Sequence, residues 1–199
     1  MRGIEGLFWN GKIWLCFPHA ELLYPDDGGG LGQGFKIIAM TRHEELLRDI
    51  ERLASSATNL EMLMQRIADR VHATMLRYNG VSFRFVDQEE PGVLVLGPYS
   101  GSFTPQPRLP FGQGLGGAAA AEGKTIVVDN VVNDTRYVPG SSMVKSEIVI
   151  PIFARGKLVA ELDIQSYFTD TFKDPVDREF VESCAKVVAK YAEGHREKA

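Results

Sequence analysis

Residues 145–166 read KSEIVIPIFARGKLVAELDIQS, and this stretch decides the fold. Two runs rich in β-branched and apolar residues flank a short break at residues 154–156, a pattern that predicts a β-hairpin. Each run also carries an acid among its apolar residues, Glu147 in the first and Asp163 in the second. The length of the turn determines whether these two carboxylates face the same side of the sheet.

Side chains alternate across a strand, so a one-residue change in register moves a side chain to the other face. A two-residue turn at Arg155 and Gly156 would leave the acids on opposite faces, whereas a three-residue loop at 154–156 would place Glu147 directly opposite Asp163. Three-residue loops commonly end with Gly in the left-handed region, so we expect the three-residue loop. Like charges directly opposite each other then require a cation, a shared proton or a bound ligand. The alternative is that one acid is solvated at a strand edge.

The composition is typical of a globular domain. The chain has 199 residues, of which 44% are hydrophobic and 24% charged, enough for one domain with a substantial core. A net charge of -4 without a basic cluster argues against nucleic-acid binding. No apolar run reaches the length of a membrane span, and the two cysteines give neither a disulfide framework nor a zinc site. We therefore expect a cytoplasmic protein with no metal, cofactor, nucleic acid or membrane among its partners.

Residues 1–40 differ from the rest of the chain. They contain both tryptophans, Trp9 and Trp14, and a Gly-rich stretch at 26–34, DDGGGLGQG, without a sustained helical or strand period. We interpret the Gly-rich stretch as a flexible linker and expect an N-terminal extension over 1–40, followed by one domain over 41–195. The apolar residues before the linker could form an arm that packs on the domain or on a partner, or could belong to an upstream extension.

From residue 41 the patterns predict an α+β domain. Thr58 and Glu61 have the spacing of a capping box, and Gly123 is placed to end a short Ala-rich helix. The expected elements, in order, are helices over 41–57 and 58–79, strands over 81–86 and 93–96, a break at 97–101, a helix over 116–122, a strand over 125–128, a loop over 129–142, the hairpin, and a helix from 174 to about 193. This order predicts an antiparallel sheet with the N- and C-terminal helices on one face and a loop-covered pocket on the other.

The hairpin and its surroundings resemble the GAF domain family, over roughly residues 43–192. The most specific segments are NDTRYVPG at 133–140, the run at 145–166, and Phe172, Asp177 and Phe180 after it. The resemblance implies a sensory domain in signal transduction that binds a small molecule in a pocket on the sheet. It also implies a homodimer formed through the terminal helices, although their apolar stripes could simply cover the chain's own sheet.

A narrower resemblance is to the free methionine-(R)-sulfoxide reductases, which are stand-alone GAF enzymes. It rests on three segments: LGPYSG at 96–101, LPFGQGLGGAAAAEGKT at 109–125 and SEIVIPIF at 146–153. The pattern of that subgroup contains three cysteines, and the matching positions here hold Gln106, Gly116 and Gly140. Of the hairpin acids of the subgroup, Glu147 and Asp163 match, and a second acid of the last strand is replaced by Gln165.

These departures put the reductase chemistry in doubt. Reduction of a sulfoxide by thiols needs one thiolate to attack sulfur and a second thiol to resolve the sulfenic acid, and carboxylates cannot supply the two electrons. Cys184 lies on the apolar stripe of the last helix and Cys16 lies in the extension, so neither replaces a loop cysteine. The pocket is therefore expected to be kept while the chemistry is lost.

We accordingly expect a non-catalytic ligand sensor rather than an enzyme. The predicted ligand-binding residues are Glu147, Asp163, Gln165, Tyr99, Tyr137, Phe83 and Phe85. The acids would receive an ammonium or other donor groups, the aromatic residues would form walls, and Arg84, Arg108 or Arg136 would hold an anionic group, which suits an amino acid or a similar zwitterion. The alternatives are a reductase-like enzyme despite the substitutions, and a dimerisation module with an empty pocket.

Overall fold

The computed structural model describes residues 6–9, 12–15 and 40–195, and the chain divides into two compact units, Met1–Thr41 and Arg42–Ala199. In the first unit, β1 (Gly6–Trp9) and β2 (Lys12–Leu15) form an antiparallel pair. This corrects the expectation of no strand pattern there, because the two segments flank Asn10 and Gly11, a dipeptide that favours tight hairpins. The stretch at 26–34, expected to be a linker, lies outside the described residues.

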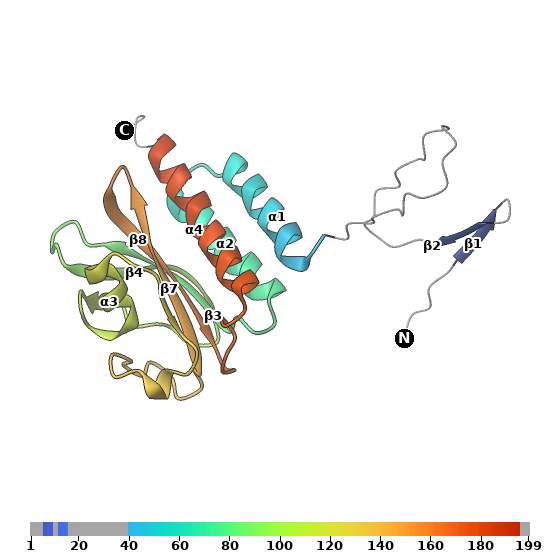
Figure 1. Ribbon diagram of the computed structural model, residues 1–199. Coiled ribbons are helices and arrows are strands. Elements are labelled where there is room, and N and C mark those ends of the chain that lie inside the picture. Colours follow the sequence, from blue (N-terminus) through green and yellow to red (C-terminus); the bar gives the residue numbers. More distant parts are fainter. Residues whose placement is uncertain (1–5, 10–11, 16–39, 196–199) are drawn as a thin grey trace. The chain divides into compact units, whose positions relative to one another are not determined.

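The second unit is the expected α+β fold (Figure 1). Its six-stranded antiparallel sheet has the order β5-β4-β3-β8-β7-β6. The strands are β3 (Gly80–Val86), β4 (Val93–Gly101), β5 (Arg108–Pro110), β6 (Ile126–Val128), β7 (Ser146–Ala154) and β8 (Lys157–Ser166). The helices α1 (Arg42–Ser56), α2 (Leu60–Thr74) and α4 (Pro175–His195) lie on one side of the sheet, and the short α3 (Gly114–Glu122) lies on the other.

Several elements differ from the sequence-based expectations: α2 ends at Thr74 and not at 79, α3 begins at Gly114 and not at 116, and strand β5 was not expected. Two further differences have a visible local cause. The cap of α2 is Asn59, whose Oδ1 accepts the backbone N–H of Met62 at 2.8 Å, so the capping box at Thr58 is wrong. The second difference is in β4, which continues through the expected break at 97–101 because a bulge opposite β3 absorbs the irregular sequence. The end of α3 is as expected, with Gly123 in the left-handed region at φ 64°.

The hairpin turn between β7 and β8 has two residues, not three. Ala154 pairs with Lys157, and both Arg155 and Gly156 have positive φ, 50° and 76°. Two central residues with positive φ are typical of the tight primed turns, whose twist matches that of the flanking strands. The prediction of a three-residue loop is therefore wrong.

A β-bulge next to the turn changes what this register means for the acids. Phe153 pairs with Leu158 while Ile152 pairs with Ala160, so β8 contains one extra residue at this point. One extra residue moves every later side chain of the strand to the other face.

After the bulge, Glu147 pairs with Gln165 and Asp163 pairs with Val149. The two acids therefore share one face of the sheet, as expected, but they are diagonal neighbours and not directly opposite each other. Neighbouring pairs extend the same face: Ser82 of β3 lies opposite Asp163, and Arg84 lies opposite Glu161.

The opposite face of the same strands forms the main core. Its buried residues come from the sheet and from α1, α2 and α4, and they include Phe83, Ile148, Ile150, Leu162 and Ile164. A smaller apolar cluster joins α3 to β6 and β7 on the other side. The sheet thus has an apolar face toward three helices and a partly polar face toward α3 and the loops.

Candidate functional site

A solvent-open cavity lies over the partly polar face of the sheet, with about 480 Å³ of space when its opening to solvent is included. Four polar side chains of β3, β7 and β8 line it from the sheet: Arg84, Glu147, Asp163 and Gln165. Strand β5, the first turn of α3 and the loops complete the lining, through Phe103, Pro105, Gln106, Leu109, Gly114, Leu115, Gly116, Tyr137, Val138 and Gly140. The cavity therefore combines a charged sheet surface with a largely apolar and glycine-rich cover.

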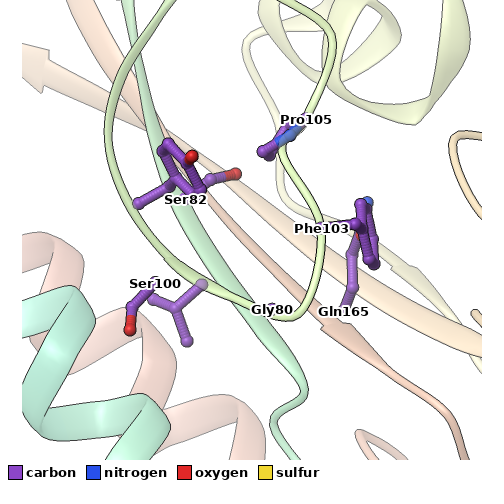
Figure 2. Close-up of a pocket in the computed structure, with 8 residues that line it drawn as sticks. Gly80, Ser82, Ser100, Phe103, Pro105 and Gln165 are labelled. Atoms are coloured by element: carbon purple, nitrogen blue, oxygen red, sulfur yellow. The ribbon is translucent and has the colours of Figure 1, made fainter.

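A smaller hollow of about 200 Å³ adjoins this cavity (Figure 2). The two spaces share Phe103, Pro105 and Gln165 among their lining residues. Tyr99 lines only the smaller hollow, and its hydroxyl lies 3.0 Å from the hydroxyl of Thr104. The lining of the hollow contains polar and apolar residues but no charged one, so it adds an uncharged extension to the charged cavity.

Three carboxyl groups cluster on the sheet side of the cavity. Glu147, Glu161 and Asp163 are only 5%, 0% and 4% exposed. Gln165 Nε2 donates to Glu147 Oε2 at 3.2 Å, and the Ser82 hydroxyl lies at the limit of hydrogen-bond distance from Asp163 Oδ2, at 3.5 Å. Asp163 Oδ1 and both oxygens of Glu161 have no hydrogen-bond partner among the described residues. Buried polar atoms are normally paired, so these oxygens call for an explanation.

Arg84 is the basic side chain of this cluster. Its Nε lies 3.4 Å from Glu161 Oε1, and its Nη1 donates to the backbone carbonyl of Gln106 at 2.7 Å. The second contact ties the loop that contains Gln106 to the sheet. One guanidinium among three carboxyl groups leaves the described cluster two charges negative when all the acids are ionised.

Burial raises the pKa of all three acids, and repulsion by neighbouring acids adds to the rise for Glu147 and Glu161. Burial, together with the charges of Asp163 and Glu161, raises the pKa of Glu147 well above its usual range. Burial and the charge of Asp163 raise the pKa of Glu161 to about 8. Burial raises the pKa of Asp163 to about 6 against the opposing effects of Arg84 and Ser82. A cation placed among the three carboxyl groups would displace protons and stabilise the ionised forms.

The acids also affect Tyr137, which lies on the loop side of the cavity. Burial, then the charges of Glu147 and Asp163, raises the pKa of its phenol to about 12. Its hydroxyl donates to the backbone carbonyl of Ser141 at 3.4 Å. At neutral pH it therefore presents a neutral hydroxyl beside the acids.

The structure brings together four of the seven predicted ligand-binding residues. Glu147, Asp163, Gln165 and Tyr137 line the larger cavity, and Tyr99 lines the hollow beside it. Phe83 is fully buried in the core toward the helices, and Phe85 packs against that core. Both belong to the opposite face of β3 from Ser82 and Arg84, so the prediction that these two rings form cavity walls is corrected.

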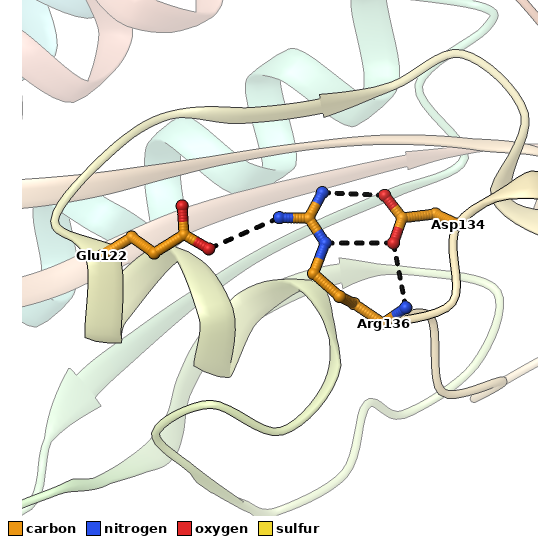
Figure 3. A network of polar contacts seen from close by, with 3 residues as sticks. All are labelled: Glu122, Asp134 and Arg136. Carbon is orange, nitrogen blue, oxygen red and sulfur yellow. Dashed lines mark hydrogen bonds and ion pairs between the residues drawn. The ribbon is translucent and has the colours of Figure 1, made fainter.

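Of the three arginines considered for an anionic group, only Arg84 lines the cavity. Arg108 forms ion pairs with Asp87 at 2.6 Å and Glu90 at 2.7 Å. Arg136 pairs with Asp134 at 2.8 Å and reaches Glu122 at the end of α3 at 3.5 Å (Figure 3). The role of Arg136 is thus to fasten the loop after β6 to α3.

Sequence reasoning missed Glu161, although the strand alternation contained the signal. Glu161, Asp163 and Gln165 occupy alternate positions of β8, so an argument that places Asp163 in a pocket places Glu161 on the same face. Glu161 is the most deeply buried of the three acids.

The three positions that the sequence resemblance matches to cysteines of the reductases all line the cavity. They hold Gln106, Gly116 and Gly140. A Cβ atom added to Gly116 would lie 2.7 Å from Glu161 Oε1, whereas a Cβ on Gly140 would meet nothing within 4 Å. The carboxyl group of Glu161 therefore occupies the space beside Gly116 that a side chain at that position would need.

Within the described part of the chain, Cys184 is the one cysteine. It is fully buried in the core on the helix side, and burial raises the pKa of its thiol. A thiol in that position has neither access to the cavity nor the thiolate character of a nucleophile. The described residues also contain no group of His, Cys, Asp and Glu side chains arranged to hold a metal ion, and none of their helices is long and apolar enough to cross a membrane.

Comparison with known proteins places the matched region over the hairpin and the cavity. Residues 59–191 match the model of the GAF domain family. Protein YtsP of Bacillus subtilis (strain 168) is 32% identical over 154 residues, covering 74% of this chain and 89% of that protein. The free methionine-R-sulfoxide reductase of Saccharomyces cerevisiae (strain ATCC 204508 / S288c) is 31% identical over 152 residues, covering 74% and 83%. The structure of free methionine-R-sulfoxide reductase from Neisseria meningitidis in complex with its substrate matches with a TM-score of 0.73 and 30% identity, over 79% of this chain and 92% of that chain.

Proposed function

The chain belongs to the GAF domain family, and we propose that it binds a small molecule with a cationic amine in the cavity without changing it chemically. The observation that carries this proposal is the cluster of Glu147, Glu161 and Asp163, buried beside a single arginine and containing oxygens without hydrogen-bond partners. An ammonium group has three donors and one positive charge, which are the two things the cluster lacks.

The cost of burying the acids supports a binding role. Isolated buried carboxylates are strongly unfavourable unless they are paired and hydrogen-bonded, or protonated. Glu147 and Asp163 line the cavity, so a ligand can reach both. The charge of a cationic ligand would offset the unfavourable burial of these carboxylates, as expected of a binding site.

The absence of a cavity thiol among the described residues supports binding without chemistry. Gln106, Gly116 and Gly140 can neither attack a sulfoxide nor form a disulfide, and Cys184 lies on the other face of the sheet. Similarity to proteins named free methionine-R-sulfoxide reductases makes amino acids and their derivatives the first ligands to test, since an amino acid also carries an ammonium group.

We further propose that ligand binding serves a sensory role in a cytoplasmic homodimer. Glu147 alternates along β7 with Ile148 and Ile150, which pack in the core that includes α4, so a change at the cavity acts on a strand that contacts a terminal helix. Light scattering with and without ligand tests the dimer. A monomer at every protein concentration would exclude it.

Calorimetric titration of the full chain with a panel of amines and amino acids, including free methionine sulfoxide, tests the binding function. We expect binding by wild type, loss of binding in Glu147→Gln, and unchanged binding in the control Glu90→Gln, whose carboxylate is exposed in the turn before β4. No heat with any compound would favour an empty dimerisation module. Formation of methionine from its sulfoxide in the presence of dithiothreitol would favour the reductase.

A further inference from the structure

Glu161 lies beside the cavity but outside its lining. Its side chain is 0% exposed, and it is not among the residues that line either space, so a ligand in the cavity does not contact it. It comes two residues before Asp163 on β8 and lies on the same face of the strand. Neither of its carboxyl oxygens has a hydrogen-bond partner in the described structure. Glu161 therefore acts on the site through its charge rather than through contact or a fixed hydrogen bond.

Arg84 is the cation through which that charge acts. It lies opposite Glu161 across β3 and β8, and its Nε is 3.4 Å from Glu161 Oε1 without a hydrogen bond. Arg84 also lines the cavity, together with Glu147 and Asp163. Burial raises the pKa values of these two acids, and the charge of Arg84 opposes the rise. The guanidinium therefore competes with a ligand amine for the same two carboxyl groups.

The protonation of Glu161 sets how strongly Arg84 competes. Burial and the charge of Asp163 raise the pKa of Glu161 to about 8, so this carboxyl is mostly protonated at neutral pH and ionised at higher pH. While Glu161 is protonated, Arg84 offsets one of the two acids that line the cavity. Once Glu161 loses its proton, it offsets Arg84 instead, and both cavity acids are left to a cation in the cavity.

We propose that Glu161 makes the affinity for a cationic amine depend on pH: the amine binds more weakly while the Glu161 carboxyl holds a proton and more tightly after the proton leaves. The inference rests on the proposed function, because it concerns the amine bound by Glu147 and Asp163. Glu161 thereby acts as a pH-sensitive modulator that does not touch the ligand, and the domain responds to an amine more strongly as the pH rises.

The titratable and charged groups that act on Glu161 come from the sheet. They are Arg84 from β3, Glu147 from β7 and Asp163 from β8. The helix α3 and the strand β5 also approach Glu161, around Gly116. The charged residues of these two elements are Glu122 and Arg108, and they form ion pairs elsewhere, with Arg136 and with Asp87 and Glu90. The loop contributes Tyr137, which stays neutral because burial and the charges of Glu147 and Asp163 raise its pKa to about 12.

Calorimetric titration at pH 6, 7 and 8 tests the proposal by comparing the full wild-type chain with Glu161→Gln, whose amide resembles the protonated carboxyl but cannot ionise. The probes are n-butylamine, cadaverine and free methionine sulfoxide. The ratio of the two affinities at each pH cancels the protonation of the probe. We expect equal affinities at pH 6 and at least about threefold tighter binding by wild type at pH 8. Threefold corresponds to about half a pKa unit, less than a charge within about 4–6 Å commonly produces.

A ratio that is the same at pH 6 and pH 8 would overturn the inference and leave the proposed function standing, because a purely structural role of Glu161 would change the affinity equally at every pH. No binding of any probe by wild type would contradict the proposed function itself, and the inference with it. The control Glu90→Gln, at an exposed carboxylate, should match wild type at each pH.

A second variant and the wild type alone keep the test independent of one substitution. Glu161→Met also removes the charge, and replacing a buried charged group by an apolar one of similar size is often tolerated, so it should repeat the result of Glu161→Gln. Thermal unfolding establishes that each variant is folded. In wild type, the affinity for a probe that binds should rise at least about threefold from pH 6 to pH 8. An affinity that stays constant or falls would overturn the inference whatever the variants do.

Discussion

The two faces of strands β7 and β8 are made of alternating residues of the same chain segments, yet one face buries apolar side chains and the other buries acids. Toward the helices, Ile148, Leu162 and Ile164 are fully buried among apolar neighbours. Toward α3, Glu147 and Asp163 are almost equally buried but have few partners. The comparison shows that burial alone does not identify a core. Burial stabilises the helix face, whereas on the cavity face it raises the pKa values of the acids and leaves oxygens without hydrogen-bond partners.

Single substitutions at neighbouring residues of β8 test the two faces separately. Leu162 is fully buried on the helix face, and Asp163 follows it on the cavity face. If the helix face stabilises the fold and the cavity face binds the ligand, a substitution at Leu162 should lower the free energy of unfolding, whereas one at Asp163 should lower ligand affinity.

The largest expected effect is on the helix face. Leu162→Ala should lower the free energy of unfolding by about 2–5 kcal/mol, because it removes buried methyl groups and leaves a cavity. Urea denaturation monitored by circular dichroism measures this, with Asp163→Asn as the neighbouring control. A loss well below 1 kcal/mol for Leu162→Ala, or a larger loss for Asp163→Asn, would remove the distinction between the faces.

The next effect is on binding at the cavity face. Glu147→Gln keeps an oxygen that can accept from Gln165 and removes the charge. We expect the affinity for an amine ligand to fall at least about 30-fold, about 2 kcal/mol, the lower end of the cost of removing one member of a buried charged pair. Calorimetry checks this against Glu90→Gln, and an affinity equal to that of wild type would show that Glu147 does not bind the ligand.

The stability of the ligand-free protein should depend on pH because of the acids on the cavity face. The folded-state pKa values of Glu161 and Asp163 are raised, to about 8 and about 6, so the folded protein binds more protons than the unfolded chain. This stability contribution is complete below about pH 4 and is lost as the pH rises through 6 to 8. Arg84 from β3, Glu147 from β7 and Tyr137 from the loop are the charged or titratable groups that act on these two acids.

Scanning calorimetry between pH 5 and pH 8 should therefore show the Tm falling by several degrees as the pH rises, since about 1 kcal/mol corresponds to roughly 2–4 °C for a chain of this size. Saturating amine ligand should flatten the profile, and so should the double substitution Glu147→Gln with Asp163→Asn. A Tm that rises over this interval in the ligand-free protein would contradict the electrostatic description of the cavity.

The smallest expected effect concerns the loop side. Arg136 is partly exposed and bridges Asp134 and Glu122, so Arg136→Ala should cost only about 0.2–1 kcal/mol in unfolding free energy. The affinity for an amine should not change, because Arg136 does not line the cavity. A large loss of affinity would show that fastening the loop to α3 is required for binding.

The sequence predicted the fold because its periodic patterns were local. The helical stripes, the Gly123 cap and the alternation of β7 and β8 each need only neighbouring residues to be recognised. It also predicted that Glu147 and Asp163 share a face, but for the wrong reason. The turn is one residue shorter than expected, and the bulge next to it restores the face. A bulge is fixed by packing across the sheet, which no local pattern reveals.

Which side chains line the cavity could not be predicted from the sequence alone. Whether Phe83 or Arg84 faces the cavity depends on the register between β3 and β8, two strands far apart in the sequence. The pairing of Arg108 and Arg136 with other acids likewise depends on contacts between turns and loops. Only Glu161 was readable from the strand alternation alone, once Asp163 had been placed in a pocket.

The most direct test of the central claim is the free energy of unfolding of Glu147→Gln at pH 8 without ligand, measured by urea denaturation. If the cavity face trades stability for binding, the variant should be more stable than wild type by about 1 kcal/mol or more, the equivalent of roughly one pKa unit relieved at a buried acid. A variant less stable than wild type would show that Glu147 supports the fold, and would contradict the division between the two faces.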